Sequence, residues 1–379
     1  MHTRPNWAEV SLSALRHNFE AVKRHVSEDV TVCCVIKCDA YGHGVVCCAR
    51  ALEQAGAEWL GVTSVEEAIA VRDAGVKTRI LIMTGFWRGE EQSVLRYGLT
   101  PAVATLEHLD ALERAAESLG MPKHSVPVHL KVDTGMSRLG LPLVELESYV
   151  QRLKASPYVV VEGVFSHLAS AEVLDAADAR QQIERFEAGL KVIEAGGLRP
   201  KYHHLANTAA TLGRPGAWHN MVRPGLALYG YSSAPNGEEK PIGPLDLRPV
   251  LTWKTKVIAM RDVPACQPVG YNGAYVTKSP TRLAVIPVGY GDGFTRHLSS
   301  RGRVIVRDQY APIVGNVSMD LTIVDVTHIA GVEIGDEVIL IGSSEHCAVP
   351  ATEHAKHAGT IVYEILCGLS PRVPRVYVE

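Results

Sequence analysis

The strongest constraint on the fold is a regular alternation of short apolar runs with stretches of helical periodicity over more than half of the chain. Eight runs rich in β-branched residues are typical of buried strands: Thr31–Ile36, Trp59–Thr63, Arg79–Met83, Thr100–Ala104, Val128–Val132, Val161–Phe165, Tyr202–Leu205 and Met221–Tyr229. Strands that alternate with helices predict a parallel sheet, because parallel neighbours need a crossover connection. Eight repeats favour a (β/α)8 TIM barrel, with a doubly wound open sheet as the alternative.

Three of the intervening stretches have clear helical signals. Ser13–Val26 has a serine placed to cap its start, and Arg180–Glu194 has helical spacing of its apolar residues. Ser64–Gly75 begins with the S-x-x-E pattern of a capping box and ends at a glycine. These signals support the alternating pattern.

The pattern changes after residues 231–249, which are rich in proline, glycine and polar residues, as a linker would be. Strand-like runs then follow at short spacing: Val250–Met260, Leu283–Pro287, Arg303–Val306, Leu321–Val326, Glu337–Ile341 and Arg375–Val378. One helical piece is expected near Ala351–Leu369, and Trp7–Ser11 resembles a further strand of this part. The prediction is a TIM barrel over residues 12–240, followed by a mostly β C-terminal domain made of residues 1–11 and 241–379.

Charge and hydropathy exclude several classes of partner. The formal net charge of −3 gives no electrostatic reason to bind nucleic acid or an anionic membrane. No apolar run approaches the roughly 20 residues that span a bilayer, and the N-terminus lacks the apolar stretch of a signal peptide. We therefore expect a cytoplasmic protein that binds neither nucleic acid nor membrane.

Five of the eight cysteines lie between Cys33 and Cys48, which raises the alternatives of a metal or redox cluster and of small buried apolar residues. There is no C-x-x-C pair, and neighbours on a strand point to opposite faces. The second interpretation is favoured. Among the sixteen histidines, the adjacent pair His203 and His204 lacks ligand spacing, so no metal site is expected.

Lys37 is the most informative single residue. It ends an apolar strand in the stretch V-I-K-C-D-A-Y-G-H-G, and active sites of barrels lie at the carboxyl ends of their strands. A partly desolvated lysine there loses proton affinity and becomes competent for Schiff-base chemistry. The alternative is a lysine whose ammonium group reaches solvent at a strand end.

Further motifs follow in a fixed order: K-V-D-T-G-M-S-R-L-G from Lys131, H-L-A-N-T from His204, V-R-P-G-L-A-L-Y-G from Val222, V-G-Y-N-G from Val269, G-Y-G-D-G from Gly289, G-N-V-S-M-D from Gly315 and V-Y-E from Val362. The set of motifs, their order and their spacing resemble those of the alanine racemase family over essentially the whole length of the chain. The resemblance implies a racemase that depends on pyridoxal 5′-phosphate (PLP) and makes D-alanine for peptidoglycan. It favours the cofactor interpretation of Lys37.

The resemblance also implies two catalytic bases. Lys37 carries PLP and acts on one face of the substrate Cα, taking the proton from D-alanine, while Tyr271 takes it from L-alanine on the other face. A free tyrosine has a pKa near 10, which is too high for a good base at neutral pH. His204 matches the family residue beside this tyrosine.

Other matched positions concern the cofactor. Arg223 matches the arginine that hydrogen-bonds the pyridine nitrogen of PLP; because arginine stays charged, that nitrogen stays unprotonated and side reactions are restrained. Tyr41, Thr208, Gly225 and Tyr363 match phosphate-binding positions, with threonine in place of the commoner serine. His167 and Asn207 match positions that line the ring and the phosphate side.

The remaining positions concern the substrate. Arg138 and the backbone N–H of Met319 match groups that bind its carboxylate, and Asp320 faces it beside Met319. Lys131 matches a lysine that is often carbamylated, the alternative being an ion pair with Asp133. Tyr290 and Arg296 match residues of the entrance corridor, whose width leaves a broad-specificity racemase open.

The family shares its active sites between two chains, so we expect an obligate homodimer with alanine as substrate. A PLP decarboxylase for basic amino acids has the same fold class, but its family places an acidic residue where Arg223 stands. A non-catalytic PLP carrier would lack the second domain with Tyr271 and Met319.

Overall fold

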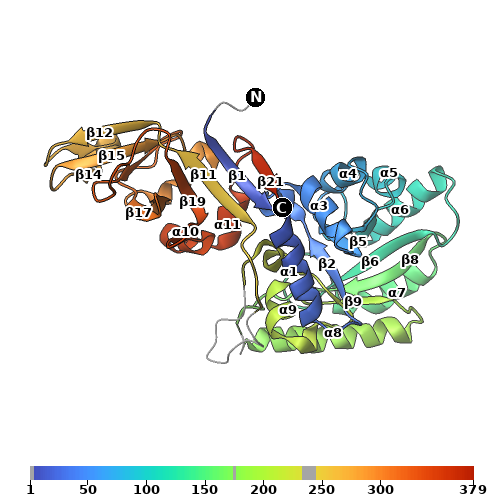
Figure 1. Cartoon of the computed structure of the whole chain (residues 1–379). Coiled ribbons are helices and arrows are strands. Elements are labelled where there is room, and N and C mark those ends of the chain that lie inside the picture. Colours follow the sequence, from blue (N-terminus) through green and yellow to red (C-terminus); the bar gives the residue numbers. More distant parts are fainter. Residues whose placement is uncertain (1–3, 174–175, 233–244) are drawn as a thin grey trace. The chain divides into compact units, whose positions relative to one another are not determined.

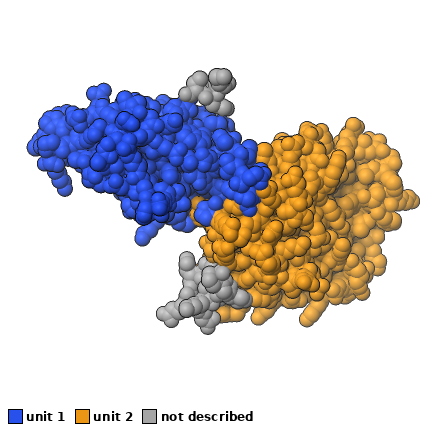
Figure 2. Space-filling model, in the orientation of Figure 1, with its two compact units in different colours: residues 1–13, 41–44, 249–379 blue, residues 14–40, 45–248 orange. Residues whose placement is uncertain are grey.

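The computed structural model describes residues 4–173, 176–232 and 245–379, so the expected domain boundary at 240 lies outside the described residues. The chain divides into two compact units (Figure 2). Unit 1 comprises residues 1–13, 41–44 and 249–379, and unit 2 comprises residues 14–40 and 45–248. Each is described separately below.

Unit 2 contains a near-closed barrel of eight parallel strands, which confirms the predicted barrel. Their order is β10-β2-β3-β4-β5-β6-β8-β9, and every bonded neighbour is parallel. The strands are β2 (Thr31–Val35), β3 (Trp59–Val62), β4 (Arg79–Ile82), β5 (Thr100–Val103), β6 (Val126–Asp133), β8 (Val159–Phe165), β9 (Tyr202–His204) and β10 (Met221–Val222), with the short β7 (Leu141–Pro142) beside β6.

Helices connect these strands and lie around them (Figure 1). They are α1 (Leu12–His25), α2 (Lys37–Gly42), α3 (Val45–Gln54), α4 (Val65–Asp73), α5 (Glu91–Arg96), α6 (Leu106–Ser118), α7 (Leu146–Lys154), α8 (Ala177–Ala195) and α9 (Thr208–Gly213). The predicted cap of α4 is confirmed, since Ser64 Oγ accepts a hydrogen bond from Glu67 N at 3.2 Å. The predicted cap at Ser13 is wrong, because α1 already begins at Leu12.

One predicted strand is much shorter in the structure. Met221–Tyr229 forms a strand only over Met221–Val222 and then a buried 3-10 helix over Leu226–Tyr229. The intervening Pro224 has no N–H to donate to a ladder, so the strand cannot continue through it. The apolar composition that indicated a strand therefore reflects burial alone.

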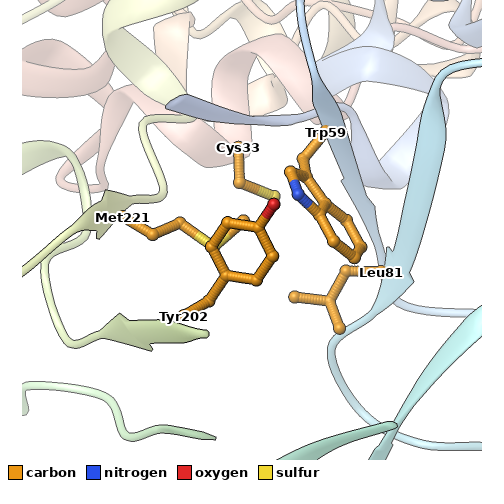
Figure 3. Close-up of a cluster of buried hydrophobic side chains, with 5 residues drawn as sticks. All are labelled: Cys33, Trp59, Leu81, Tyr202 and Met221. Carbon is orange, nitrogen blue, oxygen red and sulfur yellow. The ribbon is translucent and has the colours of Figure 1, made fainter. Parts of the chain in front are cut away.

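Buried side chains of five barrel strands, β2, β3, β4, β9 and β10, form one cluster (Figure 3). Cys33, Trp59, Leu81, Tyr202 and Met221 all point into it, and each is at most 4% exposed. All eight cysteines of the chain are free, and burial raises the pKa of the Cys33 thiol to about 12. Cys33, Cys34 and Cys48 are buried, as the interpretation of small apolar residues predicts, whereas Cys38 is exposed and Cys47 is only partly buried.

Unit 1 is mostly β. Its largest sheet has the order β17-β16-β19-β11-β1-β21 with β20 beside β19, and β12-β15-β18 and β13-β14 form two smaller sheets. The strands are β1 (Asn6–Ser11), β11 (Leu251–Lys256), β12 (Ala259–Val263), β13 (Pro268–Val269), β14 (Tyr275–Val276), β15 (Thr281–Ile286), β16 (Arg303–Val306), β17 (Gln309–Pro312), β18 (Thr322–Asp325), β19 (Glu337–Ser343), β20 (Ala348–Val349) and β21 (Arg375–Val378).

The N-terminal strand joins this unit, because β1 pairs antiparallel with β11 and parallel with β21. The predicted helical piece is two helices, α10 (Ala351–Ala358) and α11 (Val362–Cys367). Gly359 ends α10 with a left-handed φ of 71°, which glycine adopts at little cost. Across both units, none of the helices in the described residues has the length and apolar character needed to cross a membrane.

Candidate active site

Lys37 stands immediately beyond β2, at the carboxyl ends of the barrel strands, and is half-buried. The helical turn that it begins is left-handed, because Cys38 to Tyr41 have φ between 51° and 55°. That conformation costs about 1–2 kcal/mol per non-glycine residue and occurs in runs only where the surroundings impose it. Here the Glu67 side chain accepts from Cys38 N, and Asp39 Oδ1 accepts from Val45 N at 2.7 Å. The backbone around Lys37 is thus held in a strained, defined geometry, as expected at a functional site.

Arg223 follows β10 at the same end of the barrel and is only 3% exposed. Its Nη1 donates to His204 O at 2.8 Å and contacts His204 Nδ1 at 3.0 Å. Its Nη2 donates to Ser166 O at 2.7 Å and to Leu205 O at 3.2 Å, and lies 3.4 Å from His167 Nδ1. Within the described residues the Nε–H has no hydrogen-bond partner, so one donor of a fixed guanidinium is left for a ligand. Burial lowers the pKa of Arg223 to about 10, and the group stays charged at neutral pH.

The two histidines beside Arg223 differ in what they offer. His204 is fully buried, and both its ring nitrogens are used, Nδ1 by Arg223 and Nε2 by His129 at 2.8 Å. It therefore has no ring nitrogen left to hydrogen-bond a tyrosine, and its expected place beside Tyr271 stays a prediction. His167 is partly exposed and its Nε2 has no partner within the described residues, so His167 is the histidine able to meet a further group.

Two more cations belong to this part of the barrel. Lys131 lies in β6, and its Nζ donates to Met83 O at 3.1 Å and stands 5.1 Å from the Phe165 ring centroid. Burial, with the positive charges of Arg223, Arg138 and Lys37, lowers the pKa of Lys131 to about 8. Arg138 is exposed, in the loop after β6.

The alternative for Lys131 was an ion pair with Asp133. No such pair forms among the described residues, because Asp133 Oδ1 instead accepts from the backbone N–H groups of Gly135, Met136 and Ser137 at 2.9 to 3.1 Å. The carboxylate therefore shapes the loop that carries Arg138, and Lys131 has no paired anion.

The residues expected at the phosphate fall into two pairs, one in each unit. In unit 2, Thr208 Oγ1 accepts from Gly225 N at 2.9 Å, while Asn207 Oδ1 caps α9 by accepting from Ala210 N at 3.1 Å. In unit 1, the Tyr41 and Tyr363 rings are 5.9 Å apart. The members of each pair, far apart in sequence, thus lie together.

Unit 1 presents Tyr271 on its surface with 69% of the residue exposed. The backbone around it turns sharply, with φ of 74° at Gly270 and 61° at Asn272, and Asn316 Nδ2 donates to Tyr271 O at 3.0 Å. Met319 is 53% exposed. Both expected residues of this unit are therefore available to another surface.

The glycine-rich stretch from Gly289 packs against the loop that carries Met319. Tyr290 N donates to Ser318 O at 3.0 Å and Gly291 N to Met319 O at 2.9 Å. A Cβ at Gly289 would lie 2.2 Å from Ser318 O, so only glycine allows this approach. The two motifs are thus one structural feature.

Asp292 is a structural residue that sequence reasoning missed. Its side chain is fully buried, accepts two hydrogen bonds from Arg4 at 2.9 and 3.0 Å, and accepts from Gly289 N at 3.0 Å. Arg4 also donates to Asp320 O at 2.8 Å, and Arg372 Nη2 donates to Asp320 Oδ1 at 2.6 Å. The aspartate within G-Y-G-D-G was the available signal, because an aspartate in apolar sequence requires a partner.

Tyr290 and Arg296 line one cavity of about 450 Å³ in unit 1, together with Thr295, His297, Thr360 and Glu364. The wall of the cavity carries a positive charge on Arg296 and a negative charge on Glu364. The expected role of Tyr290 and Arg296 at an entrance corridor stays a prediction.

Comparison with known proteins identifies the family. The family models for the N-terminal and C-terminal domains of alanine racemase match residues 10–233 and 250–377. The chain belongs to the alanine racemase family. It is 42% identical over 364 residues to the alanine racemase of Syntrophobacter fumaroxidans, covering 96% of this chain and 95% of that one. It is 41% identical to the alanine racemase of Desulfovibrio desulfuricans, over 99% of both chains.

Solved alanine racemases share the fold over the full length. The enzyme from the D-cycloserine producer Streptomyces lavendulae has a TM-score of 0.92 and 34% identity, covering 100% of this chain and 98% of that one. The Bartonella henselae alanine racemase, which has covalently bound pyridoxal phosphate, has a TM-score of 0.87 and 29% identity over 99% of both chains. Membership makes this chain an isomerase acting on alanine.

The residues present fit a PLP cofactor. The phosphate and the substrate carboxylate are anionic, and Lys37, Lys131, Arg138 and Arg223 supply positive charge at one end of the barrel. The Nε–H of Arg223 can meet a neutral pyridine nitrogen, which accepts a hydrogen bond without a proton of its own. As an alanine racemase, the protein depends on PLP.

Proposed function

We propose that the protein interconverts L-alanine and D-alanine with two bases, Lys37 and Tyr271, on opposite faces of the substrate Cα. The observation that carries this proposal is the position of Lys37, on a strained turn at the carboxyl end of β2 and within the same cluster of charges as Arg138, Lys131 and Arg223. This is the end of a barrel where active sites lie.

The residues that match the family's cofactor-binding positions would hold the cofactor. Lys37 Nζ would bond it covalently, Arg223 Nε–H would donate to its pyridine nitrogen, and the Thr208–Gly225 and Tyr41–Tyr363 pairs would bind its phosphate. His167 and Asn207 would border it. Bound PLP withdraws electrons from the substrate Cα and so acidifies its hydrogen. Because Arg223 keeps its own proton, this withdrawal is moderate, which favours return of the proton over side reactions.

The protein moves the proton at two atoms. With L-alanine, Tyr271 Oη takes the Cα proton from one face and Lys37 Nζ returns one to the other; with D-alanine the roles reverse. One proton leaves Cα and one arrives, so the substrate balances; Tyr271 ends protonated and Lys37 Nζ deprotonated, which are the states from which the reverse direction starts. The partly exposed His167 is better placed than His204 to lower the cost of a tyrosine anion, because its Nε2 is available.

The substrate carboxylate would bind Arg138 and the Met319 N–H, with Asp320 beside them. Tyr290 and Arg296 would restrict the path to small amino acids. The Bacillus anthracis alanine racemase, 33% identical with a TM-score of 0.90, contains bound L-Ala-P. The match covers 95% of that chain. A ligand of this kind bound to a relative matched over nearly its full length supports alanine itself as the substrate.

A homodimer is part of the proposal. Tyr271 and Met319 are exposed on unit 1, and a catalytic base with no cover fits a surface that completes the site of a second chain. The active enzyme would contain two sites, each with Lys37 from one chain and Tyr271 from the other. A cytoplasmic role in supplying D-alanine for peptidoglycan completes the proposal.

The decisive experiment compares Lys37→Ala with Lys201→Ala, a surface lysine of the same barrel. Lys37→Ala should lose the visible absorbance of covalently bound PLP and all racemisation of a panel of L-amino acids, whereas Lys201→Ala should keep both. Racemisation retained in Lys37→Ala would refute the role of Lys37. Activity on many larger amino acids would instead favour a broad-specificity racemase.

Mixing two inactive variants tests the shared site. Lys37→Ala and Tyr271→Phe chains, unfolded together and refolded, should recover up to about one quarter of wild-type activity, because half of the dimers are hybrids and each hybrid has one intact site of its two. No recovery from a mixture shown to contain hybrids would contradict sharing between chains.

A further inference from the structure

Behind Arg223 the barrel contains a second buried histidine that no expected role uses. His129 lies in the middle of β6, is 0% exposed, and places its Nδ1 2.8 Å from Nε2 of the equally buried His204. His204 in turn contacts Arg223 Nη1 through its Nδ1 at 3.0 Å. The side chains of His129, His204 and Arg223 therefore form a continuous series of hydrogen bonds from the barrel interior to the guanidinium.

Donor chemistry fixes the direction of every hydrogen bond in this series. A guanidinium can only donate, so His204 Nδ1 must be the acceptor and carries no hydrogen. The single hydrogen of the neutral His204 ring is then on Nε2, which donates to His129 Nδ1. His129 must carry its own hydrogen on Nε2, and that buried atom has no partner within the described residues.

Both imidazoles are held neutral, as this arrangement requires. Burial and the positive charges of Arg79 and Arg223 lower the pKa of His129 to about 3. Burial, with Arg223 and the neighbouring histidines, lowers the pKa of His204 well below its usual value. A protonated His204 would turn a donor toward the Arg223 guanidinium, which the charge of Arg223 opposes.

The fold makes specific room for His129. The neighbouring strand has Gly163 beside the ring, where a Cβ would lie 2.5 Å from two imidazole atoms. The pairing of β6 with β8 also shifts register between Val128 and His129. Trp59 and Tyr202 cover the ring, with centroids 5.1 and 5.9 Å away. The imidazole thus has one available position, with Nδ1 toward His204.

We propose that His129 is a positioning residue, which accepts from His204 and so fixes the tautomer in which His204 receives the Arg223 guanidinium. This inference deepens the proposed function and rests on it, because the guanidinium matters to catalysis only if its free Nε–H meets the cofactor. His129 acts through His204 and Arg223 and touches no reacting atom.

Without the acceptor at position 129, His204 is no longer restricted to the tautomer that has its hydrogen on Nε2. Its Nε2–H then has no buried partner, and the alternative tautomer places Nδ1–H against Arg223 Nη1–H. We expect His129→Leu to lower kcat on the order of tenfold, the effect typical of removing the outer partner of a functional imidazole. The KM for alanine should change less than twofold, because the carboxylate-binding groups are elsewhere.

The experiment uses the holoenzyme with 15N-labelled histidine. His129→Leu removes the acceptor, and His129→Asn restores one, since Asn Oδ1 occupies the position of His Nδ1. Met221→Leu, in the buried cluster of the same barrel, is the packing control. For each, the imidazole 15N shifts, the visible absorbance of bound PLP, kcat and KM, and the thermal midpoint are measured.

The proposal expects wild type, His129→Asn and Met221→Leu to hold His204 neutral with its hydrogen on Nε2. In His129→Leu the His204 signal should move toward the other tautomer and the PLP absorbance should shift, with kcat restored in His129→Asn. A wild-type His204 that is charged or protonated on Nδ1 at neutral pH would overturn the proposal, even if His129→Leu fails to fold. Unchanged His204 shifts and kcat in a folded His129→Leu would overturn it as well.

Failure of the proposed function has a different result. The imidazole shifts report the chain of hydrogen bonds whether or not Arg223 meets PLP. If Arg223→Lys left the PLP absorbance and kcat unchanged while the wild-type tautomers were as expected, the role of Arg223 would fail and the hydrogen-bond chain would stand without a catalytic purpose.

Discussion

Carbamylation of Lys131 is the prediction for which the structure gives a magnitude. CO₂ reacts only with the neutral amine, and the surroundings lower the pKa of Lys131 from 10.5 to about 8. At pH 7 the neutral fraction rises from about 0.03% to about 9%, a gain of about 300-fold. The product is an anion, and the charges of Arg223 and Arg138, which add to burial in lowering the pKa of Lys131, would stabilise it.

The pH dependence has a definite sign. A depressed lysine pKa means that the neutral amine gains population as pH rises through about 8. The neutral fraction of Lys131 rises from about 1% at pH 6 to about 50% at pH 8, so at equal dissolved CO₂ the carbamate at Lys131 should increase by tens of fold over that interval. A lysine with its usual pKa is almost entirely charged over that interval and stays unmodified.

The assay is 13C NMR of the holoenzyme equilibrated with 13CO₂. One carbamate resonance should appear, vanish in Lys131→Met, and persist in Lys201→Met, whose lysine is on the surface. Lys131→Met should also raise the KM for alanine more than it lowers kcat, because Arg138 loses the anion that orients it. Absence of the resonance at pH 8, or its survival in Lys131→Met, would refute the reasoning.

Three further substitutions test separate links. Tyr271→Phe should slow Cα deuterium exchange of L-alanine on the order of 10³-fold while sparing that of D-alanine. Exchange is the assay because the equilibrium constant fixes the ratio of the overall racemisation rates, so only exchange can differ between the two enantiomers. Equal losses of exchange from both enantiomers would argue against opposed bases. Asp292→Ala should lower the free energy of unfolding in urea by about 3 kcal/mol, since it removes the buried carboxylate that accepts from Arg4 and leaves Gly289 N without its acceptor. The exposed Asp246→Ala is the control, and equal effects would contradict a structural role for Asp292. Ser64→Ala should lower the free energy of unfolding in urea by about 1 kcal/mol, because it removes the cap of α4. A negligible change in that free energy would show that the cap is dispensable.

Much of the fold was predictable because it depends on local pattern. The eight barrel strands follow from runs of buried β-branched residues, and the cap at Ser64 follows from a side chain three residues from its partner. The errors occurred where local composition has two explanations. Residues 226–229 are as apolar as a strand, yet Pro224 prevents the ladder and the segment forms a 3-10 helix.

Hydrogen-bond partners were less predictable than positions. The sequence placed His204 near the catalytic centre, but only the structure showed that both its ring nitrogens are used and that His167 has one available. His129 carried no signal beyond an apolar strand. Its importance depends on Gly163 of the neighbouring strand β8 and on Trp59 of β3, both of which are distant from it in sequence.

The sequence by itself determined the barrel and the β-rich part after it, because both follow from local patterns along the chain; the attachment of the cofactor to Lys37 stays a prediction from the order of the motifs. Tertiary structure alone decided the charge and protonation of that site. The pKa of Lys131, the tautomer of His204 and the free Nε–H of Arg223 all depend on burial and on neighbours brought from other strands, and no local pattern encodes the desolvation that sets them.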